Sequence, residues 1–151
     1  MSTIGLLVAL HALAAAIWVG GMAFAHFSLR PAARTFDPPI RLPFMAAVLG
    51  SFFRFVWGAI VLLLLTGYGI MSIHGFGGWG VYVHLMQASG LIMMALFAHL
   101  WFAPWKRMER AVAAKDWPAA ARALDQIRQI VTINLMLGTV TVLMGAGGRW
   151  L

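Results

Sequence analysis

The sequence predicts an all-α integral membrane protein, an up-and-down bundle of four transmembrane helices. Of the 151 residues, 62% are hydrophobic and only 10% are charged, whereas a soluble domain carries about 25% charged residues. Four apolar stretches are each long enough to cross a bilayer, which takes roughly 20 helical residues. The basic residues are concentrated in two of the three connections between these stretches. The chain is therefore expected to have most of its surface in lipid.

The four stretches fill one transmembrane domain, residues 1–151, and leave no room for a separate soluble domain. The N-terminus lacks the basic segment and cleavage site of a signal peptide, so the first stretch is expected to remain as a span. Arg30-Pro31 is expected to end the first span, Pro104 the third and Gly148-Arg149 the fourth. The expected spans are residues 3–29, 45–73, 81–103 and 130–147.

The connections differ strongly in charge. Residues 30–43 and 105–129 together hold nine of the eleven Lys and Arg residues, and residues 74–80 hold none. By the positive-inside rule the basic connections are expected to be cytoplasmic, so both termini and the glycine-rich loop face outward. Asp116 is expected to cap a helix beginning at Trp117-Pro118, making residues 105–129 a helical connection at the lipid surface. A docking site is the alternative interpretation of this segment.

Several classes of function are excluded by composition. The formal charge is +7, but nucleic-acid binding is not expected, because no basic stretch carries the aromatic residues of such a site. The basic residues are instead expected to set the topology and to meet anionic lipid. The sequence contains no cysteine, which excludes disulfides and thiolate chemistry. All four acidic residues lie in the basic connections, so no paired carboxylates are available for hydrolysis. The bilayer is the one partner that composition predicts.

Four histidines occupy matched positions in the first and third spans. His11 and His26 are 15 residues apart, and so are His84 and His99. This spacing corresponds to a rise of roughly 22 Å and a rotation of about 60°, which keeps both histidines on one broad face. Because the two spans are parallel, His11 with His84 and His26 with His99 would form two stacked bis-histidine sites, the arrangement of membrane b-type cytochromes. The alternative is four histidines near the membrane surfaces that bind no ligand.

Copper is a second candidate for a histidine-ligated metal. The sequence has ten methionines, and Met22 and His26 are four residues apart on one helical face. Imidazole and thioether ligands together suit copper, especially Cu(I). Methionine also fills apolar helices, and Met93 and Met94 are more simply interpreted in that way. The choice between haem b and copper stays open on these residues alone.

Further residues extend both candidate sites. His74, in the uncharged loop, would join His11 and His84 in an outward-facing copper site. Trp18 follows His11 by seven residues on the same face, where it would pack against a cofactor or simply against another helix. Arg54, at the inner edge of the second span, would bind a haem propionate or reach lipid phosphate.

The chain resembles the CopD (copper resistance protein D) family of small bacterial membrane proteins. The more specific parts of the resemblance are His11, Trp18-Val-Gly-Gly21 and Arg30-Pro31. Other supporting segments are Arg54-Phe-Val-Trp57, Thr66-Gly-Tyr68, His84, Phe97-Ala-His99 and Ala146-Gly-Gly-Arg149. The resemblance implies copper uptake or tolerance at the inner membrane, alongside a periplasmic copper-binding protein.

A more distant resemblance is to the HemJ-type protoporphyrinogen oxidases, four-helix membrane proteins that bind b-type haem. His11 with Trp18 and His84 match that family's pattern. The sequence departs from it at Met86, where the family has lysine, and at Val131, where it has arginine. This resemblance implies a haem-dependent membrane oxidoreductase, should the chain be an enzyme.

Three functions are therefore expected as alternatives. The first is copper handling by a CopD-like protein with a histidine-ligated metal. The second is electron transfer across the bilayer between bis-histidine haems, with a redox partner. The third is a membrane assembly partner without a cofactor. Small residues at Ala12, Ala16 and Gly20 would allow close helix packing, either within the protomer or in a homo-oligomer.

Overall fold

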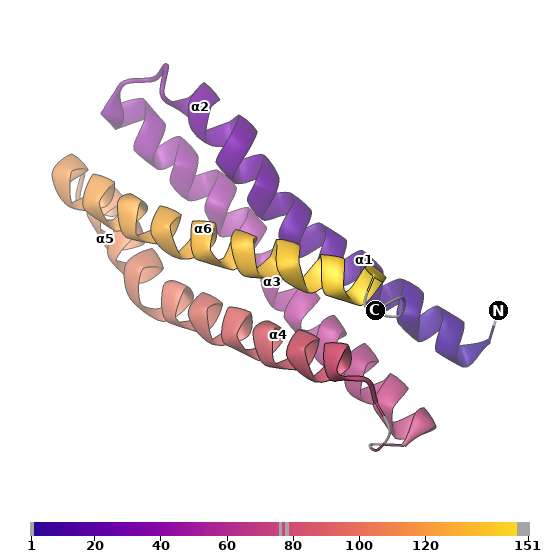
Figure 1. Ribbon diagram of the computed structural model, residues 1–151. Coiled ribbons are helices and arrows are strands. Elements are labelled where there is room, and N and C mark those ends of the chain that lie inside the picture. Colours follow the sequence, from indigo (N-terminus) through magenta and orange to yellow (C-terminus); the bar gives the residue numbers. More distant parts are fainter. Residues whose placement is uncertain (1, 76, 78, 148–151) are drawn as a thin grey trace.

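The computed structural model describes residues 2–75, 77 and 79–147. Every element in this part of the chain is helical, and four rods run alternately in opposite directions (Figure 1). The predicted all-α fold is confirmed, whereas the predicted stop at Gly148-Arg149 lies outside the described residues. Four helical rods are long and apolar enough to cross a membrane: Thr3–Ala33, Pro38–His74, Val81–Ala113 and Trp117–Gly147.

A π-helical turn interrupts the first rod near its basic end. The rod consists of α1 (Thr3–Phe24), the π turn η1 (Ala25–Leu29) and α2 (Arg30–Ala33). In η1 the backbone N–H of Arg30 bonds the carbonyl of Ala25, five residues back. Pro31 follows at once; it has no N–H and its ring crowds the preceding turn, which a wider π turn relieves. Arg30-Pro31 therefore widens the helix and does not end it.

The second rod is the single helix α3 (Pro38–His74). Two prolines begin it, Pro38 and Pro39, which suit a first turn whose N–H groups have no helical partner. It ends at Gly75, whose φ of 86° is readily adopted only by glycine. The helix thus begins seven residues before the expected span, in the basic connection.

The third rod repeats the design of the first. It consists of α4 (Val81–Leu100), the π turn η2 (Trp101–Trp105) and α5 (Lys106–Ala113). Pro104 lies inside η2 and does not end the helix, which continues past the predicted end of the third span. As at Pro31, the wider turn accommodates the proline ring, and the helix continues into the basic connection.

The fourth rod, α6 (Trp117–Gly147), begins well before the apolar span. The Asp116 carboxylate accepts a hydrogen bond from the backbone N–H of Ala119 at 3.0 Å. This is the predicted N-cap, and helix 117–147 runs without interruption from the basic connection into the membrane. The chain reverses between α5 and α6 at Lys115, which has a φ of 55°.

The rods do not pack equally against one another. α1 packs mainly along α3, α4 packs along α6, and α6 also contacts α1 and α3. Near the basic end, α3 and the third rod are joined by aromatic rings in edge-to-face contact around Phe53. The ring centroids of Phe97, Trp101 and Trp105 lie 5.7, 6.4 and 5.2 Å from that of Phe53. Large rings thus fill the space between these rods.

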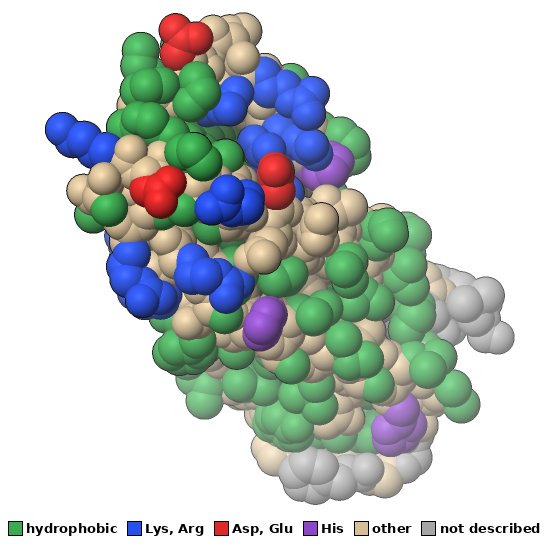
Figure 2. Space-filling model, turned by 90° about the vertical axis from the view of Figure 1, so that its left-hand side faces the viewer, with side chains coloured by type: hydrophobic (Ala, Val, Ile, Leu, Met, Phe, Trp, Pro, Cys, Tyr) green, Lys and Arg blue, Asp and Glu red, His purple; other side chains and the backbone are tan. Residues whose placement is uncertain are grey.

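Charge divides the molecule into two ends. The Lys and Arg side chains gather at one end, above a body of hydrophobic side chains (Figure 2). This end, formed by residues 30–43 and 105–129, is called the basic end below. The first residues of α1 and the last residues of α6 point away from the basic end (Figure 1). The basic residues are thus separated from the rest of the molecule in space, as their positions in the two connections predicted. The orientation of the bundle in the membrane stays a prediction.

Candidate functional site

His11 is held by a polar partner in the neighbouring helix. Its Nδ1 lies 2.8 Å from the hydroxyl oxygen of Thr66 in α3. That hydroxyl lies 2.6 Å from the carbonyl of Leu62, to which it donates its single proton. The Thr66 oxygen therefore accepts from Nδ1–H, and the lone pair of neutral His11 is on Nε2. Gly67 makes room for the ring, since a Cβ there would lie 3.3 Å from His11 Cε1.

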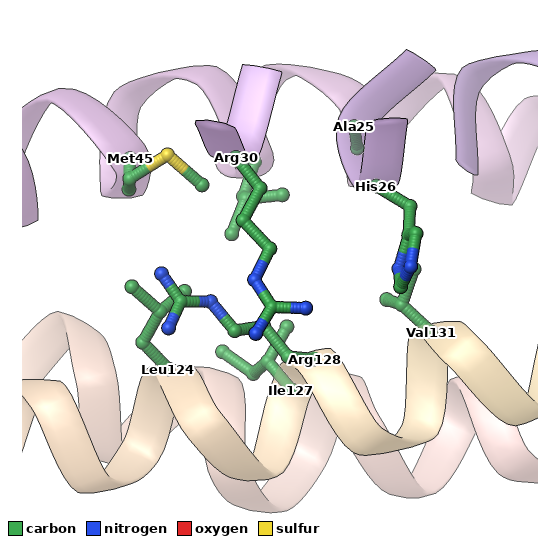
Figure 3. A pocket seen from close by; sticks show the side chains of 9 residues that line it. Ala25, His26, Arg30, Met45, Leu124, Ile127, Arg128 and Val131 are labelled. Atoms are coloured by element: carbon green, nitrogen blue, oxygen red, sulfur yellow. The ribbon is translucent and has the colours of Figure 1, made fainter. Parts of the chain in front are cut away.

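His26 has the same arrangement with a different helix. Its Nδ1 lies 3.4 Å from the Thr132 hydroxyl in α6, and that hydroxyl donates to the carbonyl of Arg128 at 2.8 Å. Figure 3 shows the ring extending from the first rod toward α6. His11 and His26 thus face different neighbours, α3 and α6, although they lie on the same rod.

The other three histidines are exposed. His84 and His99 lie on the surface of α4, and His74 lies at the end of α3 beside Trp79, with ring centroids 5.7 Å apart. Since His11 bonds α3 and His26 approaches α6, the structure does not join them to the histidines of α4. Within residues 2–75, 77 and 79–147, no three His, Asp or Glu side chains are grouped to hold a metal.

Side chains fill the space beside Trp18, where the sequence suggested that a cofactor would pack. Trp18 is 2% exposed and packs edge-to-face on Phe97 of α4, with centroids 6.1 Å apart. At Gly21 the ring of Phe52 occupies the position that a Cβ would take. Arg54 is exposed on α3. Trp18 and Gly21 thus take part in helix packing, whereas Arg54 does not.

Two methionines converge at the centre of the bundle. Met22 of α1 and Met93 of α4 are 2% and 3% exposed. Their terminal methyl carbons lie 3.6 and 3.0 Å from the point where Gly138 of α6 would carry a Cβ. Val19 Cγ2 lies 2.8 Å from the same point, so the glycine at this position lets the methyl groups of Met22 and Met93 meet beside Val19. Met22 was among the predicted ligands, whereas Met93 was interpreted as filler.

Asn134 adds a polar group beside these methionines. Its amide nitrogen donates to the backbone carbonyl of Met93 at 3.1 Å, and the side chain is 2% exposed. Its amide oxygen is buried and has no hydrogen-bond partner among the described residues. Sequence reasoning missed this residue, although the only asparagine of the chain stands in the middle of an apolar span.

This central group has the chemistry of a soft-metal site. Thioether sulfur is a soft ligand that favours Cu(I), and an unpaired buried amide oxygen is costly unless it finds a partner. We call Met22, Met93 and Asn134 the central site. It is separate from His11, which lies about 16 Å nearer the N-terminus along α1 at 1.5 Å per residue.

Comparison with known families agrees with these observations. The family model described as Copper resistance protein D matches residues 46–147, more than half of the chain. The chain belongs to the CopD family. No curated protein and no solved structure matches it.

Membership of the CopD family makes the chain a copper-resistance membrane protein. The matched residues include Met93 and Asn134 of the central site, together with His74, His84 and His99. They begin after the first rod, so His11, Trp18, Met22 and His26 lie outside the match. The role of these four residues therefore depends on their geometry and on the resemblance in the first span.

Proposed function

We propose that this CopD protein handles copper by binding Cu(I) at the central site. The observation that carries the proposal is the convergence of Met22 and Met93 on Gly138. Both side chains are buried, come from different helices and bring their methyl groups together at Gly138. Asn134, one helical turn before Gly138, carries a buried amide oxygen that has no partner among the described residues. Two sulfurs and one oxygen are a ligand set that selects Cu(I) over hard cations such as Mg²⁺.

His11 would supply an imidazole ligand nearer the termini. Its Nδ1–H bond to Thr66 leaves Nε2 as the free ligand atom, which is the usual arrangement of a metal-binding histidine. Met22 follows 11 residues later and His26 four residues after that, so α1 and η1 present copper ligands at three depths. The exposed His74 and His84 would capture copper at the end that carries the termini.

The first test is the affinity of the purified protein for Cu(I). Protein in mild detergent would be titrated anaerobically against a colorimetric Cu(I) chelator. We expect Met22→Leu and Met93→Leu each to weaken binding by at least about tenfold, since even outer-shell changes cost that much. Met136→Leu is the matched control, because Met136 is 59% exposed on α6, away from the central site.

A visible spectrum with metal analysis separates this proposal from the haem alternative. We expect no Soret band, and copper in stoichiometric amount. A Soret band with split bands after dithionite reduction would instead establish b-type haem, and His11→Ala and His84→Ala should then abolish the same centre. Protein that binds neither copper nor haem would leave a cofactor-free assembly partner. Equal losses in Met136→Leu and Met22→Leu would also contradict the central site.

A further inference from the structure

Three arginines from three different rods converge at the basic end. Arg30 lies at the start of α2, Arg41 in the first turn of α3, and Arg128 in α6. Arg30 and Arg41 are both close enough to repel Arg128 electrostatically. Figure 3 shows Arg30 extending from the first rod to α6, while Arg128 extends from α6 toward Met45. We call these residues the arginine cluster.

The cluster contains buried donors that lack acceptors. The Nε atoms of Arg30, Arg41 and Arg128 are all buried without a hydrogen-bond partner. Across residues 2–75, 77 and 79–147 only five buried side-chain nitrogen or oxygen atoms are in this state, and the cluster supplies three of them. A guanidinium donor withdrawn from water is costly unless it meets an acceptor.

The protein itself supplies too little negative charge for the cluster. Arg128 bonds Asp125 through Nη1 and Oδ1 at 2.8 Å, and the Asp125 side chain is 64% exposed. The other ion pair among the described residues joins Lys106 and Glu109, which are outside the cluster. The three guanidinium groups therefore have a single carboxylate partner, that of Asp125, and this carboxylate is itself mostly exposed to solvent.

The surface beside the cluster is shaped for a ligand with a polar and an apolar part. An open groove of about 560 Å³ runs between the first rod and α6. It is lined by Arg30 and Arg128, by the carboxylate of Asp125, and by Gln129, Thr132 and the apolar side chain of Ile133. A narrow cavity shares Arg30 and Arg128 with this groove and continues between apolar walls from Leu49, Leu124 and Val131. Charged hydrogen-bond donors thus lie directly beside an apolar surface that is compatible with hydrocarbon chains.

We propose that the arginine cluster binds the phosphate of an anionic membrane phospholipid. Arginine forks match phosphate oxygens, and phosphate accepts several charge-assisted hydrogen bonds at once. The cluster lies where the apolar spans begin, which is the depth of lipid headgroups. Bound phosphate would satisfy the buried Nε donors and hold the first rod, α3 and α6 together. This proposal does not depend on copper binding.

Lipid binding would be measured on the full chain in mild detergent. Native mass spectrometry would count bound phosphatidylglycerol or phosphatidylcholine, and thermal unfolding would be followed with each lipid and with inorganic phosphate. We expect one phosphatidylglycerol to be retained and to raise Tm, whereas phosphatidylcholine and inorganic phosphate have little effect. Arg30→Gln and Arg128→Gln should each weaken retention about fivefold, the effect of one basic residue near an anionic membrane surface.

Matched controls are available at the same end. Arg34 and Arg122 are exposed, so Arg34→Gln and Arg122→Gln remove the same charge without touching the buried donors. If these controls lose lipid as strongly as Arg30→Gln, general surface charge attracts lipid and the site is refuted. Equal retention of both lipids refutes it too, and this comparison needs only the wild-type protein. Stabilisation by inorganic phosphate alone would reassign the ligand to free phosphate.

Discussion

The Nδ1 atom of His11 lies 2.8 Å from the Thr66 hydroxyl oxygen, across the interface between α1 and α3. Thr66 is 2% exposed, and its proton is already donated to the carbonyl of Leu62. One hydrogen bond therefore joins the two helices in the membrane and also determines which ring nitrogen of His11 remains free. Stability and ligand chemistry depend on the same contact.

Thr66→Val should destabilise the bundle, because valine keeps the shape of threonine but leaves Nδ1–H of His11 without an acceptor. Interhelical hydrogen bonds in membranes contribute about 0.6 kcal/mol on average and up to about 1.7 kcal/mol. We expect a loss in this range, measured by unfolding in mixed micelles with increasing SDS. In the His11→Leu background the same change should cost nearly nothing.

Ser72→Ala is the control for this measurement. The Ser72 hydroxyl donates to the carbonyl of Gly69 within the same helix, at an exposed position. Its removal breaks no contact between helices and should leave stability nearly unchanged. An equal cost for Thr66→Val with and without His11 would show that the two residues are not energetically coupled.

Gly20 and Gly21 should respond oppositely to alanine. A Cβ at Gly20 meets nothing within 4 Å, so Gly20→Ala should be neutral or stabilising by up to about 1 kcal/mol through helix propensity. A Cβ at Gly21 would overlap the Phe52 ring, so Gly21→Ala should cost about 1–3 kcal/mol as overpacking does. The same SDS titration measures both. Equal effects would mean that Phe52 moves aside freely.

The orientation in the membrane can be tested with single cysteines, since the natural sequence has none. We expect a membrane-impermeant maleimide to label Gly77→Cys in intact cells and to label Arg34→Cys only after the cells are opened. Both positions are exposed, so neither substitution disturbs packing. Labelling in the reverse order would place the basic end outside, against the positive-inside rule.

The four rods could be predicted from sequence because hydropathy and charge are local properties. The N-cap of α6 at Asp116 could also be predicted, because it needs only a short polar side chain before a helix that begins with proline in its first turn. Neither Pro31 nor Pro104 ends its helix, although each was expected to mark the end of a membrane span. A proline can be accommodated by one wide turn, and the residue pattern does not show which outcome will occur.

The arrangement of the histidines could not be predicted in the same way. The spacing of His11 and His26 implies a rotation of about 60° between them and does not show which helix each will meet, and the structure brings them to α3 and α6. The neighbours of each helix are also a property of the whole bundle: α1 packs along α3, so His11 meets Thr66, 55 residues away. The convergence of Met22 and Met93 likewise requires knowing that Gly138 lies between them.

The aromatic contact between α3 and the third rod also makes the basic end visible to spectroscopy. The indole rings of Trp101 and Trp105 are stacked, with centroids 6.3 Å apart and planes inclined by 20°. Transitions of two such rings couple, and a coupled pair gives circular dichroism bands of opposite sign that a lone tryptophan does not give. The ring centroid of Trp57 in α3 also lies 6.3 Å from that of Trp101, so the couplet reports on the packing of α3 against the wide turn as well as on the pair that flanks its proline. The protein thus carries its own optical probe beside the lipid boundary, and no label is required to read it.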